Sequence, residues 1–291
     1  MIDDNESLVS IVIACYNHEK FVQDSIKSII DQTYQNIELI IIDDGSKDNS
    51  VEQIQKMIPK CKERFVRFEF RHRPNKGLSA TLNEALDWCE GEFYSPFASD
   101  DIMLPLKTEI QVNYLRNNIN DLLILGGREI IDENNKLIGK SEFNEIKSYT
   151  FEQIIMQNYY TIYAPTLMAR LSIIKNIRYD PTLAIEDWYM WLKISKINNI
   201  NVLPNILIKY RWGSHNTSLI SEKFLNDKMA VLSKFQHEPL YNEALKQLEF
   251  NNTLDIFKIN KLKGFSSLIS FAITYPTYIP RKTLRYFYNK F

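Results

Sequence analysis

The stretch IELIIIDDGS, residues 37–46, decides the fold class of this chain. Its first six residues are almost entirely apolar and rich in β-branched side chains, as in a buried strand of a parallel sheet. The run ends abruptly at Asp43, Asp44, Gly45 and Ser46, and apolar residues at helical spacing follow from Val51. This pattern predicts a strand, an acidic turn and a helix.

The same alternation continues on both sides of this stretch. Strand patterns occur at residues 9–14, 66–70 and 92–97, and helical patterns at residues 22–30, 51–58 and 78–89. This order is typical of an α/β fold with a mostly parallel central sheet and helices on both faces. Because ligands of such sheets bind beyond the carboxyl ends of the strands, we expect Tyr16–Asn17, Asp43–Asp44 and Asp100–Asp101 to converge on one crevice.

The second half of the chain is less regular. We predict helices at 105–117 and 186–195, strands at 122–125, 201–203 and 206–210, and a hairpin turn at 132–135. Beyond Ser221 the pattern is helical and then basic and aromatic.

The charge of the chain is unevenly distributed. Its 291 residues are 45% apolar and 24% charged, as in a globular protein, with a net charge of −1. Residues 256–291 hold seven Lys or Arg and no Asp or Glu, which leaves residues 1–255 near −8. A region with this negative charge is not expected to bind nucleic acid. The basic tail indicates a contact with an anionic surface, with packing on the domain as the alternative.

Asp100 and Asp101 are the first candidates for a ligand site. Two adjacent carboxylates at the end of an apolar strand are costly to bury unless a cation or hydrogen-bond donors compensate them. Mg²⁺ and Mn²⁺ prefer carboxylate oxygens and bridge to phosphates. A turn in which Asp101 or Ser99 caps the next helix is the alternative.

The other candidates also have structural alternatives. Asp43 and Asp44 offer acceptors to a base N–H or a ribose hydroxyl, or belong to a capping turn. The Tyr16 ring stacks on a nucleobase or lies partly buried at a strand end. Glu186 and Asp187, beside aromatic residues, are either a general base or the acidic first turn of a helix. Candidates for a diphosphate contact are Arg73, Lys76, Arg211 and His215, of which His215 is also a candidate metal ligand.

Taken together, these residues resemble the family 2 glycosyltransferases of the GT-A fold. The matching stretches, in order, are residues 10–17, 32–34, 38–48, 75–79, 99–105, 186–188 and 210–211. The resemblance covers roughly residues 8–220. We therefore expect a catalytic domain at 1–220, with a nucleotide-binding half at 1–105 and an acceptor half at 106–220, and a helical extension at 221–291.

The resemblance implies a role for each matching residue. The donor-binding residues would be Tyr16, Asn17, Asp43, Asp44, Lys76, Asp100 and Arg211. Asp101 would bind Mn²⁺ or Mg²⁺. His215, which lies outside the matching stretches, is a further candidate metal ligand, with a plain loop histidine as the alternative. Asp187 would deprotonate the acceptor hydroxyl, with Glu186 as the alternative base. The family commonly has a further acid where this chain has Ala98, which leaves one ribose or metal contact without its residue.

The implied reaction is inverting transfer of a sugar from a nucleotide-diphosphate donor, with a UDP-sugar favoured, to a glycan or lipid-linked acceptor in bacterial surface polysaccharide synthesis. The alternatives are a dTDP-sugar transferase such as a rhamnosyltransferase and a non-catalytic relative that binds glycan or nucleotide. A nucleotidyltransferase is disfavoured because no glycine follows the first strand, at residues 15–18.

The expected location is the cytoplasm, at the inner face of the membrane through residues 256–291. Cys15, Cys61 and Cys89 are too widely spaced for a zinc site and fit a reducing compartment. The acidic N-terminus does not resemble a signal peptide, and no stretch reaches the roughly 20 apolar residues that span a bilayer.

Overall fold

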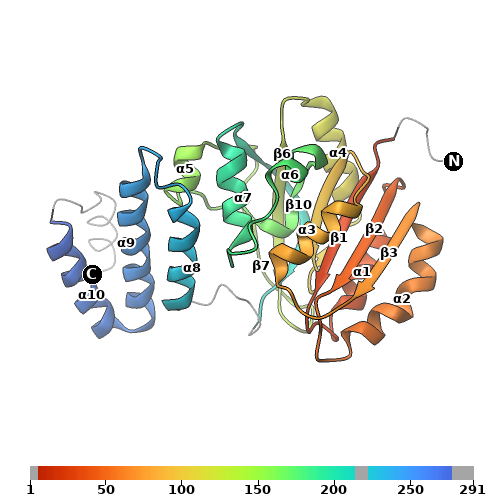
Figure 1. The fold of residues 1–291 in the computed structure, drawn as a ribbon, viewed down its shortest axis with the longest axis horizontal. Helices are drawn as coiled ribbons and strands as arrows, with labels where there is room; N and C mark the ends of the chain where they lie inside the picture. The colour runs from red at the N-terminus through yellow and green to blue at the C-terminus, as the bar shows by residue number, and fades with distance from the viewer. Residues whose placement is uncertain (1–5, 214–221, 277–291) are drawn as a thin grey trace. The chain divides into compact units, whose positions relative to one another are not determined.

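The computed structural model of the protein describes residues 6–213 and 222–276. The chain divides into two compact units, Met1–Phe151 with Tyr159–Asn216 and Glu152–Asn158 with Thr217–Phe291. The larger unit contains the central sheet, and Figure 1 shows the order of its strands and helices.

Strands and helices alternate through the first third of the larger unit. They are β1 (Val9–Cys15), α1 (Val22–Ile30), β2 (Ile37–Asp43), α2 (Ser50–Arg64), β3 (Arg67–His72), α3 (Leu78–Trp88) and β4 (Phe93–Ala98). The four strands lie in the order β3-β2-β1-β4, and all neighbouring pairs are parallel. The predicted alternation is confirmed.

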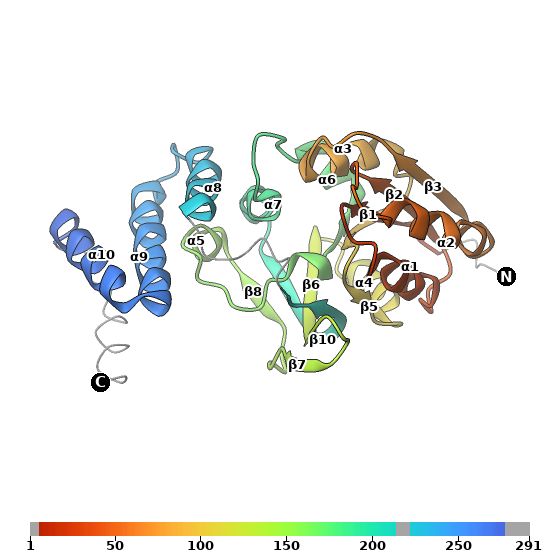
Figure 2. The ribbon, with the colours of Figure 1, turned by 90° about the horizontal axis from the view of Figure 1, so that it is seen from below.

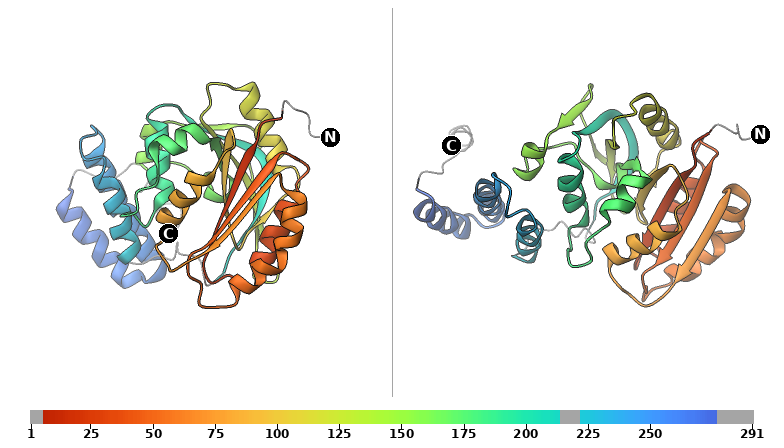
Figure 3. Two further views of the ribbon diagram at one scale, coloured as in Figure 1. Left: turned by 45° about the vertical axis from the view of Figure 1, so that its right-hand side comes forward. Right: turned by 45° about the horizontal axis from the view of Figure 1, so that its top comes forward.

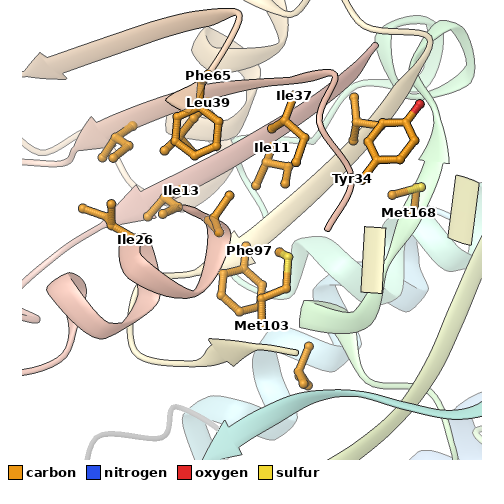
Figure 4. Close-up of a cluster of buried hydrophobic side chains, with 14 of the residues drawn as sticks. Ile11, Ile13, Ile26, Tyr34, Ile37, Leu39, Phe65, Phe97, Met103 and Met168 are labelled. Atoms are coloured by element: carbon orange, nitrogen blue, oxygen red, sulfur yellow. The ribbon is translucent and has the colours of Figure 1, made fainter. Parts of the chain in front are cut away.

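The apolar runs of β1 and β2 form the middle of the sheet because both faces are covered. Ile11, Ile13 and Leu39 belong to a buried cluster with Ile26 of α1 and Phe65 at the end of α2 (Figure 4). Figure 2 shows α1 and α4 on this face and α3 on the opposite one. Complete burial of each such side chain contributes about 1.5–3 kcal/mol.

Glu38 is a charged residue inside the buried run of β2, and the fold satisfies it locally. Its carboxylate accepts hydrogen bonds from the Ser10 hydroxyl, the Arg67 guanidinium and the backbone N–H groups of Glu90 and Gly91. A buried carboxylate compensated in this way does not interrupt the strand.

The rest of the larger unit extends the sheet. Its elements are β5 (Ile102–Met103), α4 (Lys107–Asn117), β6 (Leu123–Ile131), β7 (Leu137–Lys140), β8 (Lys147–Tyr149), η1 (Ala164–Thr166), β9 (Met168–Arg170), α6 (Leu171–Ile177), α7 (Glu186–Ser195) and β10 (Ile200–Arg211). The sheet continues as β4-β9-β6-β10-β5, with β9 antiparallel to both of its neighbours. Strand directions rotate across it (Figure 3).

The prediction of two short strands near the end of the larger unit is wrong. The predicted strands at 201–203 and 206–210 are a single strand, β10, whose register against β6 shifts between Leu203 and Ile206. Pro204 lies at this shift, and a proline has no N–H to donate to a sheet ladder. In the sequence, Pro204 therefore gives the same signal as the end of a strand, although the strand continues.

In its described residues, the smaller unit contains all but the first residue of α5 (Phe151–Ile155) and the consecutive helices α8 (Glu222–Ser233), α9 (Tyr241–Ile259) and α10 (Lys261–Thr274). Phe250 of α9 and Phe271 of α10 lie with their ring centroids 5.3 Å apart. The expected helical extension is therefore present over residues 222–276. Among the helices described, none has the length and apolar composition required to cross a membrane.

Candidate functional site

The loops that follow β1, β2 and β4 leave the sheet at the same edge. Cys15 pairs with Asp43 across β1 and β2, and Ala14 pairs with Ala98 across β1 and β4. Hydrogen bonds join the loops: Asn17 N donates to Ser46 Oγ at 2.9 Å, and His18 Nδ1 lies 2.7 Å from Ser99 Oγ. The three polar clusters therefore meet at one sheet edge, as the strand order predicts.

Asp43 is fully buried and organises its own turn. Its carboxylate accepts hydrogen bonds from the N–H groups of Gly45 and Ser46 and from the Ser46 hydroxyl. His72 Nδ1 lies 3.0 Å from the same carboxylate. These contacts fix the shape of the turn that carries Asp44.

Asp44 joins its turn to the loop at residues 73–77. Its carboxylate accepts hydrogen bonds from Lys76 N at 2.8 Å, from Gly77 N at 2.9 Å and from the Arg73 guanidinium. A carboxylate has about four lone-pair positions, so three internal donors leave little capacity for a nucleobase. Gly45 permits this approach because a Cβ there would lie 2.6 Å from Asn75 N.

Arg211, at the end of β10, forms hydrogen bonds that hold Asp100 and Asp101 in position. Arg211 N donates to Asp101 Oδ1 at 2.8 Å, and its Nε donates to the carbonyl oxygen of Asp100 at 2.8 Å. The Arg211 guanidinium also contacts the carbonyls of Asp132 and Glu133 and is 3% exposed. Arg211 therefore positions the acidic pair in this structure, and its predicted contact with the donor stays a prediction.

The second carboxylate oxygen of Asp101, Oδ2, is buried and has no hydrogen-bond partner. Burial raises the pKa of Asp101 well above its usual range, and the adjacent Asp100 raises it further, while the N–H and the charge of Arg211 lower it. Such a group requires a proton or a cation beside it. This orphaned oxygen is the feature of the loop that points to a ligand.

Glu186 and Asp187 form the first turn of α7, as expected. Burial raises the pKa of Glu186 to about 8, and the charge of Asp187 contributes to the shift. The segment before α7 is attached to α3, since Ser79 Oγ donates to the carbonyl of Leu183 at 3.3 Å. Because α3 begins directly after Gly77, this contact ties the α7 acids to the loop that Asp44 holds.

The remaining expected residues differ in exposure. The Tyr16 ring is 44% exposed at the end of β1 and is therefore accessible for stacking. Lys76 is exposed, with its Nζ 3.6 Å from Glu84. His215 lies outside the described residues. Among those described, no group of three or more His, Cys, Asp or Glu side chains could hold a metal ion by itself.

The sequence profile described as glycosyl transferase family 2 matches residues 10–178, which is more than half of the chain. The chain belongs to glycosyltransferase family 2. The matched region contains β2 to β4, all of β1 except Val9, the Asp43–Asp44 turn and the Asp100–Asp101 pair.

Relatives of this family 2 glycosyltransferase differ in length. UDP-Glc:alpha-D-GlcNAc-diphosphoundecaprenol beta-1,3-glucosyltransferase WfgD of Escherichia coli is 31% identical over 239 residues, which are 81% of this chain and 89% of that protein. An uncharacterized glycosyltransferase of Rickettsia felis is 31% identical over 252 residues, 82% of this chain. The match spans only 40% of the length of the Rickettsia protein.

Solved structures share the fold. S. aureus TarS 1–349 in complex with UDP-GlcNAc superposes with a TM-score of 0.65 and 18% identity, covering 91% of this chain and 80% of that one. Mannosyltransferase PcManGT from Pyrobaculum calidifontis, in complex with GDP-Man and Mn²⁺, superposes with a TM-score of 0.64 and 11% sequence identity. The superposition covers 97% of this chain and 79% of that one. The expected GT-A fold is confirmed.

Proposed function

We propose that the protein transfers a sugar with inversion from a nucleotide-diphosphate donor, with a UDP-sugar favoured, to a hydroxyl group of a saccharide acceptor. The catalytic domain would be residues 1–220. The observation that carries this proposal is the buried, unpartnered Oδ2 of Asp101 beside Asp100, at the sheet edge where Tyr16 and the Asp44 turn also lie.

A hard divalent cation fits these residues. Carboxylate oxygens are the preferred protein ligands of Mg²⁺ and Mn²⁺, and Mg²⁺ sites often combine one or two carboxylates with substrate phosphates. Asp101 would hold the ion, with His215 as a further candidate ligand. When bound, the ion supplies positive charge that stabilises the departing nucleotide diphosphate.

The acceptor side is assigned to the start of α7. Asp187 would accept the proton of the attacking hydroxyl, and Glu186 is the alternative base. Because the pKa of Glu186 is raised to about 8, Glu186 holds its proton at neutral pH. Asp187 is therefore the better proton acceptor under these conditions.

For the acceptor, the support is the relative WfgD, whose name specifies a GlcNAc linked to diphosphoundecaprenol and a UDP-Glc donor. We propose a lipid-linked saccharide of this class, as in bacterial surface polysaccharide synthesis. A dTDP-sugar donor is the second candidate, because thymine presents the same hydrogen-bonding edge as uracil.

We also propose that α10 contacts an anionic membrane surface. Leu262, Phe265, Ile269 and Ile273 are exposed at helical spacing along it. Residues 256–291 have seven basic and no acidic residues, and this charge, together with the exposed apolar side chains, favours an anionic lipid surface over a neutral one. The protein should sediment with vesicles containing phosphatidylglycerol, and a Phe265→Ser, Ile269→Ser variant should not. Equal sedimentation of both would reject the contact.

Donor titration tests the main proposal. Calorimetry with UDP-Glc, UDP-GlcNAc, dTDP-Glc and GDP-Man, each with Mn²⁺ and with EDTA, should give the tightest binding for a UDP-sugar with Mn²⁺. Asp101→Asn should bind the same donor in EDTA as wild type does but gain little from Mn²⁺. Absence of binding by every nucleotide sugar would refute the proposal.

A further inference from the structure

Arg128 forms a cluster with Tyr163 and Tyr210 that has no role in the site described above. Arg128 lies on β6, Tyr210 lies on the neighbouring β10, and Tyr163 directly precedes η1. The guanidinium carbon is 3.8 Å from the centroid of the Tyr163 ring and 4.4 Å from that of the Tyr210 ring. Contacts with ring faces hold a guanidinium in place without using its N–H donors.

The backbone N–H of Arg128 donates to Ser141 Oγ, but its guanidinium N–H groups donate to no residue in the described part of the protein. Nε is buried without a hydrogen-bond partner, and no carboxylate of residues 6–213 or 222–276 forms an ion pair with this side chain. In contrast, Arg73 is paired with Asp44 and Glu84. A positioned guanidinium with unused donors is suited to bind an anion.

The cluster also lies beside the acidic pair. Tyr210 precedes Arg211, whose N–H donates to Asp101, and β6 runs parallel to β10 with Ile131 opposite Arg211. Arg128 itself lies opposite Ile208 in the same parallel pairing, three residues before Ile131. Arg128 therefore lies on the strand next to β10, whose last residue, Arg211, holds Asp101.

We propose that Arg128, held by Tyr163 and Tyr210, binds a phosphate group of the substrate beside Asp101. This inference rests on the proposed function. The planar guanidinium can donate two parallel hydrogen bonds to phosphate oxygens. The phosphate belongs either to the donor diphosphate or to a diphosphate in the acceptor, and the proximity to Asp101 favours the donor.

The test uses Arg128→Met, which keeps an unbranched stem against the tyrosine rings but removes the charge and the donors. UDP and uridine are titrated into both proteins by calorimetry with Mn²⁺. If Arg128 binds the donor, UDP affinity falls about tenfold or more while uridine affinity is unchanged. If it binds the acceptor, UDP affinity is unchanged, and inorganic pyrophosphate binds the UDP-saturated variant about tenfold more weakly than it binds UDP-saturated wild type.

Controls separate this outcome from others. Lys56→Gln removes a positive charge from an exposed position on α2, where Lys56 pairs with Glu52, and should bind UDP as wild type does. Arg128→Lys retains the charge but loses the two parallel donors and the planar contact with the rings, so UDP affinity should fall by an intermediate factor of about three to ten. This variant gives the test if Arg128→Met does not fold. UDP and pyrophosphate affinities within twofold of wild type would overturn the inference. Failure of wild type itself to bind UDP would instead overturn the proposed function.

Discussion

Two groups of polar side chains lie around the same sheet edge and differ in how the protein satisfies them. The Asp43 and Asp44 carboxylates accept several hydrogen bonds each from neighbouring loops. Asp101 Oδ2 and Arg128 Nε are buried without a partner. An unsatisfied buried polar group costs about 1–3 kcal/mol. We infer that the first group builds the loops and that the second is kept for a ligand.

The two acids at the start of α7 are a further place where the protein keeps ionisable groups at a cost in folding free energy. The pKa of Glu186 is raised to about 8 by burial and by Asp187, so the protein holds two carboxyl groups together at a cost in folding free energy. When folding raises the pKa of a carboxyl group, the protonated group stabilises the folded protein at low pH. For Glu186 this contribution is complete below the pKa of the unfolded chain, near 4.5, and is lost as the pH rises through the folded pKa of about 8. Perturbed pairs of this kind are frequent at sites of proton transfer.

The largest expected effect is on catalysis at Asp187. Asp187→Asn should lower the transfer rate by about 10²–10⁴-fold, because a general base contributes that much, while UDP affinity stays as in wild type. Single-turnover transfer from a radiolabelled UDP-sugar, with calorimetry for UDP, measures both quantities. Glu186→Gln is the matched control and should retain most activity. A wild-type rate for Asp187→Asn, with loss in Glu186→Gln and a rate rising up to about pH 8, would move the base to Glu186.

The features that were predictable from sequence are local ones. The apolar runs of β1 and β2 and the acids that follow them are adjacent in the chain, so strand periodicity and parallel topology were enough to bring Asp44 and Asp101 to one edge. The same reasoning predicted Glu186 at a helix start.

The use of each side chain was not predictable, because it depends on contacts between residues distant in sequence. Arg211 is a candidate phosphate contact in the sequence, and only the structure shows that its Nε donates to the backbone carbonyl of Asp100. Arg128 carries no local signal, since Tyr163 and Tyr210 reach it from η1 and β10. Residue type therefore predicts which groups are candidates, and tertiary contacts determine which of them are already engaged within the protein.

An intermediate effect is expected on the free energy of unfolding, when Asp44, whose carboxylate is hydrogen-bonded within the protein, is compared with Asp101, whose Oδ2 has no partner. Asp44→Asn should lower the free energy of unfolding by about 1–3 kcal/mol, because Arg73 loses a buried carboxylate partner. Asp101→Asn should leave it unchanged or raise it, since the substitution removes a buried charge that is poorly compensated. Urea denaturation without donor or metal measures both. Equal destabilisation by the two variants would remove the distinction between them.

The smallest expected effect concerns Lys107, a fully buried residue of α4 whose Nζ donates to Ser95 Oγ at 2.8 Å. Burial lowers the pKa of Lys107 to about 7. The unfolded chain keeps this amine protonated up to about pH 10.5, so above pH 7 the unfolded state binds more protons and stability rises with pH. Between pH 7 and 8 this contributes about 1 kcal/mol. Lys107→Met should lack that increase in urea denaturation and should retain UDP binding, as expected for a group that already has its partner. Equal pH dependence in both proteins would show that Lys107 does not lose its proton in this range.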